Sequence, residues 1–234
     1  MKNQYFGDEN DYRKYGLLRI FSGGGQFRIG ICWMLTDNDG RTDGQLTRYL
    51  KMPQMYRHYD HQLFDHLHKS VIVDNIRNVQ SVQNKELLPG AKFYNEILHD
   101  QMARRKTYFK LMRKRFVDMD LIFFDPDNGI EIKSKPMGRK GSSKYLYWSE
   151  LSKTFDAGQS ILVYQHCPRE DRTTFIKRMV AEYQSHTGAV EIHWFQTPRV
   201  IYFLATQPKH VKWVRERVRQ VAEKWVDNNQ ILPR

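Results

Sequence analysis

The chain has only two cysteines in 234 residues, Cys32 and Cys167, and neither has the spacing of a metal ligand. Both lie in or beside apolar runs, so we expect reduced, buried thiols and no disulfide framework. No apolar run is long enough to cross a bilayer, and the polar start MKNQYFGDENDYRK contains no apolar signal segment. Together these absences predict a cytoplasmic protein that has no membrane partner.

The sequence also lacks internal repeats, low-complexity tracts and a linker that would divide it. Apolar residues make up 40% of the chain and aromatic residues 13%, which favours a packed core over disorder. We therefore expect residues 1–234 to form a single domain with a core that needs no covalent staple. Composition does not define the oligomeric state.

Acidic residues are in deficit. Lys and Arg total 38 against 26 Asp and Glu, which gives a net charge of +12 and a pI near 9.6. Such an excess favours an anionic partner, and nucleic acid (RNA or DNA) is favoured over a membrane because the chain lacks a lipid-binding amphipathic tail. The alternative is a basic surface without a partner.

Apolar runs alternate with helical patterns along the chain. The runs predict buried strands at 27–35, 119–125 and 159–165, and helical periodicity marks 59–70, 100–117 and the stripe from Val211 to Trp225. Residues 91–98 fit a strand or a helix. Strands of this kind, separated by helices, predict an α/β fold with a Rossmann-like, mostly parallel sheet and helices on both faces. The segments AVEIHWFQ and VIYFLATQ, split by TPR, add a C-terminal antiparallel hairpin.

Polar loops follow three of the predicted strands. They are TDNDG (36–40), DPDNG (125–129) and YQHCPR (164–169). Ligands of open α/β sheets bind beyond the carboxyl ends of the strands, so these loops are expected to converge on one site.

Three segments resemble the class I S-adenosylmethionine-dependent methyltransferases. The nearest resemblance is to the J-type enzymes, which methylate the N6 amine of a ribosomal-RNA adenine, and a looser one is to the three-Cys-motif partner proteins. The segments are YFGDENDYRKYGLLR (5–19), LIFFDPDNG (121–129) and GQSILVYQHCPR (158–169).

The resemblance implies a catalytic role for the loop after the second buried strand. The side chain of Asp125 and the carbonyl of Pro126 would accept hydrogen bonds from the target amine. Asp127 stands where the family motif has a proline. Asn128 takes the place of the aromatic that stacks on the flipped base.

The resemblance also implies S-adenosylmethionine as cofactor and a nucleic-acid substrate. Cofactor contacts are expected from Asp8 and Lys14 and from the loop after the first strand, with Asp37, Asp39, Gly40 and Asp43. Substrate contacts are expected from the basic segment KSKPMGRKGSSK and the third strand end, with Lys133, Arg139, Lys140, Lys144, Tyr164, His166 and Arg169.

Structural roles compete with these functional ones. In the structural interpretation, Asp8 or Asn10 caps the first helix, with the cap role favoured for Asn10, and Lys14 is exposed. His166 has the alternative role of a hydrogen-bonded structural histidine. A second basic run, Arg104 to Arg115, has no acidic residue, and we expect its aromatics Tyr108 and Phe109 to be core residues.

Two other functions remain open. Asp125, Glu131 and Lys133 resemble the PD-(D/E)XK nucleases, in which the two carboxylates bind Mg²⁺, with Asn128-Gly129 as a hairpin turn between two strands. A methyltransferase fold that only binds nucleic acid is the other possibility. The stretch is also compatible with a turn whose acids only cap and solvate.

Overall fold

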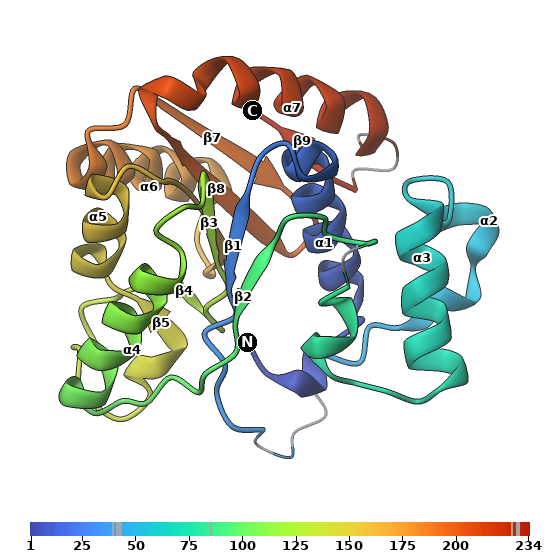
Figure 1. Cartoon of the computed structure of the whole chain (residues 1–234), viewed down its shortest axis with the longest axis horizontal. Coiled ribbons are helices and arrows are strands. Elements are labelled where there is room, and N and C mark those ends of the chain that lie inside the picture. The colour runs from blue at the N-terminus through green and yellow to red at the C-terminus, as the bar shows by residue number, and fades with distance from the viewer. Residues whose placement is uncertain (39, 41–43, 85, 226, 228–229) are drawn as a thin grey trace.

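The computed structural model describes residues 1–38, 40, 44–84, 86–225, 227 and 230–234. It contains a seven-stranded sheet of order β2-β1-β3-β6-β8-β7-β9, with helices on both faces (Figure 1). The seven strands are β1 (Ile29–Cys32), β2 (Lys92–Tyr94), β3 (Leu121–Phe124), β6 (Ser160–His166), β7 (Glu191–Gln196), β8 (Val200–Thr206) and β9 (Leu232–Pro233). The helices are α1 (Glu9–Ser22), α2 (Pro53–Tyr56), α3 (His61–His68), α4 (Met102–Arg115), α5 (Trp148–Asp156), α6 (Arg172–Thr187) and α7 (Val211–Trp225).

The strand directions confirm the predicted fold class. β2, β1, β3 and β6 pair in parallel, so their carboxyl ends meet at one edge of the sheet, which we call the carboxyl edge. β8 pairs antiparallel with β6 and β7 antiparallel with β8, which forms the expected C-terminal hairpin. The ambiguous segment 91–98 contains β2.

The apolar runs are continuous because the sheet is buried on both faces. Ile29, Ile31 and Trp33 belong to the core beneath α1, α3 and α7, whereas Cys32 and Met34 belong to the core beneath α4, α5 and α6. The same alternation runs through β3, β6 and β8. A strand with a core on each side has no polar face, which is why its sequence shows no alternation.

One local prediction is wrong. Asn128-Gly129 does not join two strands of a hairpin: β4 (Gly129–Ile130) pairs in parallel with β5 (Tyr145–Leu146) in a separate two-stranded sheet. β3 is flanked by β1 and β6. The hairpin arrangement that supported the nuclease interpretation is therefore absent from this segment.

None of the helices in the described part of the chain has the length and apolar character needed to span a membrane.

Candidate functional site

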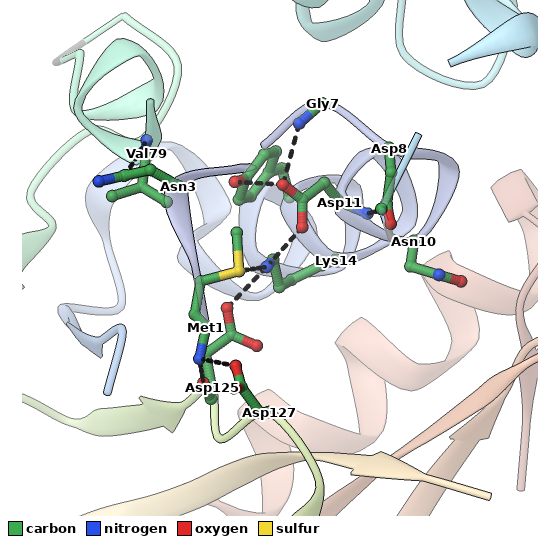
Figure 2. A network of polar contacts seen from close by, with 12 residues as sticks. Met1, Asn3, Gly7, Asp8, Asn10, Asp11, Lys14, Val79, Asp125 and Asp127 are labelled. Carbon is green, nitrogen blue, oxygen red and sulfur yellow. Dashed lines mark hydrogen bonds and ion pairs between the residues drawn. The ribbon is translucent and has the colours of Figure 1, made fainter. Parts of the chain in front are cut away.

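A buried ion cluster lies where α1 crosses the carboxyl edge (Figure 2). The Nζ atom of Lys14 is 2.6 Å from a carboxylate oxygen of Asp11 and 2.7 Å from Oδ2 of Asp125. All three side chains are almost completely buried. Asp11 also accepts hydrogen bonds from the Gly7 N–H at 3.0 Å and the Tyr15 hydroxyl at 2.9 Å. The cluster therefore fixes the first turns of α1 on the end of β3.

The charges of this cluster depend on one another. Burial alone would lower the pKa of Lys14, but Asp11 and Asp125 raise it above its usual value, so the ammonium persists. Burial raises the pKa of Asp125, and the charge of Lys14 opposes that shift. Removal of the cation would leave two carboxylates in an apolar interior.

The loop after β3 contributes residues both to this cluster and to a neighbouring cleft. Asp125 points to Lys14, whereas Asp127 and Asn128 line the cleft. Asp127 is held at its two oxygens, at 2.7 Å from the Met1 amine and 3.2 Å from the Thr36 hydroxyl. Although burial opposes ionisation, the Met1 ammonium keeps the pKa of Asp127 below its usual value.

The backbone of Asn128 is fixed while its side chain is left free. Its N–H donates to the carbonyl of Lys144 at 3.0 Å, and its carbonyl accepts from the Gln165 amide at 3.2 Å and the His166 N–H at 3.3 Å. Within the described residues, the Asn128 amide has no hydrogen-bond partner. The loop therefore presents this amide to the cleft from a rigid frame.

Gly129 makes this frame possible. Its φ is +109°, and a Cβ there would lie 2.3 Å from Oε1 of Gln165. That same oxygen accepts from the Ile130 N–H at 2.9 Å. A side chain at position 129 would therefore be strained and would displace the glutamine that holds the loop.

The cleft at the carboxyl edge has a volume of about 650 Å³, within the range of small-molecule sites. Carboxylates and amides line the cleft on the side of α1 and of the loop after β3, and the cations of its lining come from several segments of the chain. It is lined by Lys2, Tyr5, Asp8, Asn10, Gly44, Leu46, Asp127, Asn128, Lys144, Tyr164, His166, Cys167, Arg172, Pro198, Arg199 and Val200.

Asp8 and Asn10 bring polar groups to the cleft from the start of α1 (Figure 2). Asp8 is the N-cap of the helix and accepts from the Asp11 N–H at 2.9 Å, so the cap role is confirmed for Asp8 and is wrong for Asn10. Burial and the nearby charge of Asp11 raise the pKa of Asp8 to about 7. Oδ1 of Asn10 is buried and has no hydrogen-bond partner among the described residues, so it is an acceptor without a donor.

The structure brings together part of the predicted site. Of the residues predicted to contact cofactor or substrate, Asp8, Lys144, Tyr164 and His166 line the cleft, and so does Asn128 of the catalytic set. Asp125, Pro126 and Lys14 border a smaller hollow of about 50 Å³ that shares Tyr5, Asp8, Asn10, Asp127 and Tyr164 with the cleft. Lys14 is buried, so the interpretation that leaves it exposed is wrong.

Other predicted residues lie elsewhere. Asp37 and Gly40 are exposed and do not line the cleft, and Asp39 and Asp43 lie outside the described residues. Arg169 is exposed and also does not line it. Lys133, Arg139 and Lys140 lie in the loop that leads to Lys144, outside the cleft lining.

Sequence reasoning missed several cleft residues, among them the polar side chains of Lys2, Asn10, Arg172 and Arg199. Arg172 donates to the carbonyls of Thr197 and Pro198 and thereby holds the β7–β8 turn against the start of α6. The polar start of the chain was a signal for Lys2 and Asn10. No sequence pattern connects Arg172 to Arg199, because the fold alone brings α6 and the hairpin turn together.

The metal-site alternative finds different partners for its two carboxylates. Asp125 is bound to Lys14, and Glu131 accepts from the Trp148 N–H at 2.7 Å, at the start of α5. In the described part of the chain, no group of three or more His, Cys, Asp or Glu side chains is arranged to hold a metal ion.

Searches against protein-family models and against curated proteins found no match for this chain.

Proposed function

We propose that the protein is a cytoplasmic methyltransferase that binds S-adenosylmethionine in the cleft and acts on an amine of a nucleic-acid base. The observation that carries this proposal is the cleft itself. It lies at the carboxyl edge, beside β3 and β6, and its lining includes Asn128, whose side-chain amide is free, and Asn10, whose buried Oδ1 has no donor among the described residues. The strand order, with antiparallel β8 inserted between β6 and β7, agrees with the class I resemblance.

The residues of the cleft fit the cofactor. S-adenosylmethionine carries an ammonium group and ribose hydroxyls, which are donors that suit the unpaired Oδ1 of Asn10 and the carboxylate of Asp8. Tyr5 adds an aromatic surface at the same end. When bound, the cofactor supplies an electrophilic methyl group.

Asn128 would orient the acceptor. Its Oδ1 can accept a hydrogen bond from a base amine, and its backbone is already fixed by Lys144, Gln165 and His166. Asp8, with a pKa near 7, is suited to take the proton that the amine releases. Asp125 acts as a positioning residue, because its carboxylate is occupied by Lys14 and holds the loop from below.

A calorimetric titration with S-adenosylmethionine tests the proposal. We expect saturable binding, weakened about tenfold by Asn10→Ala because a buried hydrogen bond to the ligand is lost. Gln184→Ala is the matched control, since this amide lies exposed on α6 and does not line the cleft. No heat and no thermal stabilisation at millimolar ligand would refute the proposal.

Methyl transfer is tested separately. Protein, cellular RNA or DNA and cofactor with a tritiated methyl group are incubated together, and label in the nucleic acid is counted. We expect incorporation by the native chain and its loss in Asn128→Ala. Cofactor binding without incorporation into any nucleic acid would contradict the assigned substrate class.

We do not propose the nuclease, because Asp125 and Glu131 are held by different partners.

A further inference from the structure

The segment 133–144, which we call the basic turn, carries cations that the ion cluster and the cleft frame do not use. Within the described residues, its four exposed cations form no salt bridge, whereas the half-buried Lys144 interacts electrostatically with Asp127. These cations are Lys133, Lys135, Arg139, Lys140 and Lys144. Unpaired cations this close in sequence repel one another, so an anionic ligand would relieve the repulsion.

The basic turn has a fixed shape because Asp100 binds it from beneath. The Asp100 carboxylate accepts from the Gly141 N–H at 2.8 Å and the Ser143 N–H at 2.7 Å. Burial opposes ionisation of Asp100, but these hydrogen bonds hold its pKa below the usual value. The aspartate therefore stays charged at neutral pH and keeps the turn closed.

Arg105 fixes the same turn from the side of α4. Its guanidinium donates to the carbonyls of Ser142 at 3.1 Å and Tyr145 at 2.6 Å, and it is paired with Glu150 at 2.6 Å. Arg105 is buried, so it does not belong to the predicted basic surface of its helix. Both clamps hold the C-terminal end of the basic turn, and a segment that is already held loses less conformational entropy when it binds a ligand.

The basic turn connects the cleft with the start of α4. Lys144 lines the cleft at one end. In the middle of the turn, Gly138 packs so closely on Met102 that a Cβ would lie 2.8 Å from that side chain. Arg104, the next cation along α4, is exposed and also has no acidic partner in the described part of the chain. Positive charge thus continues from the cleft to a helix that contains no acidic residue.

We propose that the basic turn, together with Arg104, is a preformed docking surface for the phosphates of a single-stranded nucleic acid whose target nucleotide enters the cleft. The proposal rests on the proposed function for the role of the cleft. A single strand is favoured because a cleft of about 650 Å³ can admit a nucleotide but not a duplex. RNA and DNA offer the same phosphate chemistry here.

Binding of a fluorescent single-stranded oligonucleotide, measured by anisotropy over a series of salt concentrations, tests the proposal. Arg139→Gln/Lys140→Gln removes two cations that lie outside the cleft lining. The logarithm of the binding constant falls linearly with the logarithm of the salt concentration, and each phosphate contact contributes about 0.7 to the magnitude of this slope. The magnitude of the slope should therefore decrease by about 1.4 in the variant. The matched control is Lys212→Gln/Arg219→Gln on α7, which has the same change in charge and should keep the native slope. Equal effects of the two pairs would overturn the proposal.

Asp100→Ala separates a fixed turn from charge alone. This substitution makes the protein more positive, so simple electrostatics predicts tighter binding. Loss of the clamp on Gly141 and Ser143 predicts about fivefold weaker binding instead. Unchanged or tighter binding would overturn the role of the preformed turn.

Three further arms define the partner. RNA and DNA oligonucleotides of one sequence distinguish the two sources of phosphate. A hairpin duplex should bind more weakly than the single strand, and equal binding overturns the single-strand assignment. Polyglutamate of equal charge should compete poorly, and equal competition would assign the surface to an acidic protein.

Cofactor titration distinguishes failure of this inference from failure of the proposed function. The variants at 139 and 140 should bind S-adenosylmethionine as the native chain does. If the native chain binds no cofactor but the turn variants still lose oligonucleotide affinity, the docking surface stands and the methyltransferase proposal falls.

Discussion

The first and last residues of the loop after β3 differ in whether their polar side chains already have a partner. At Asp125, the side chain is buried and neutralised by Lys14, and Asp11 completes the cluster. Three residues later, Asn128 keeps its amide free beside a cleft that Lys144 also lines. The comparison shows that one short motif can contribute to folding at its first residue and to binding at its last.

The difference follows from what covers each part of the carboxyl edge. Residues 1–14 cover the ends of β1 and β3, and there the carboxylates of Asp11, Asp125 and Asp127 are paired with the ammonium groups of Lys14 and Met1. Beyond β6, the carboxyl edge borders the open cleft, and the cations of the basic turn and of the β7–β8 turn are accessible to solvent. Charge is therefore structural where the edge is covered and available to ligands where it is open.

Lys14→Met should have the largest effect on stability. It keeps the length of the side chain but leaves Asp11 and Asp125 buried without a cation, which costs about 3–5 kcal/mol. Chemical denaturation of the variant measures the loss. Lys144→Met is the matched control in the open region and should change stability by no more than about 0.5 kcal/mol. Equal losses would show that the two regions do not differ as we describe.

How much of the fold and of the site could be predicted from the sequence depends on how far apart along the chain the interacting residues lie. The strands β1, β3 and β6 were predictable because each is an apolar run with a core on both faces. The edge at which their loops meet followed from the parallel order. β4 and β5 were not predictable, since strands of two residues have no periodicity.

The directions in which the side chains point were harder to predict from the sequence. Nothing near Asp125 shows that its partner is Lys14, 111 positions away. Arg105 looks like its exposed neighbours in a basic helix, although it is buried on Glu150, 45 positions away. Sequence thus located the loops after β3 and β6, which line the cleft, but did not reveal which of their charges are neutralised.

Asn128→Ala should have a large effect on function and a small one on stability. The free amide makes no hydrogen bond in the described structure, so we expect the free energy of unfolding to change by less than about 0.5 kcal/mol. Loss of the oriented acceptor should lower methyl transfer about 100-fold, with cofactor affinity unchanged. Denaturation, calorimetry and label incorporation measure the three quantities. A large loss of stability would show that the side chain of Asn128 contributes to folding, as that of Asp125 does.

Gly129→Ala should disturb the boundary between the two regions. The new Cβ would meet Gln165 at 2.3 Å in a backbone conformation with φ of +109°, so we expect about 1–3 kcal/mol of destabilisation. The variant Gly129→Ala/Gln165→Ala removes the clash and should recover part of the stability. Recovery to the native value would mean that the clash, not the backbone conformation, is the cost.

Asp8→Asn should have an effect on stability that depends on pH. The pKa of Asp8 rises from an ordinary value of 3.8 to about 7 on folding, because of burial and the charge of Asp11. Between these values the unfolded chain has released the proton and the folded chain keeps it, so this group makes the native protein less stable as pH rises, up to about 7. Asparagine can still cap α1 and does not ionise. The Tm of the variant minus that of the native chain should therefore increase from pH 4 to pH 7 and then level off. A difference that stays constant over this range would show that Asp8 ionises normally, and with it the proposed proton acceptor of the cleft would be lost.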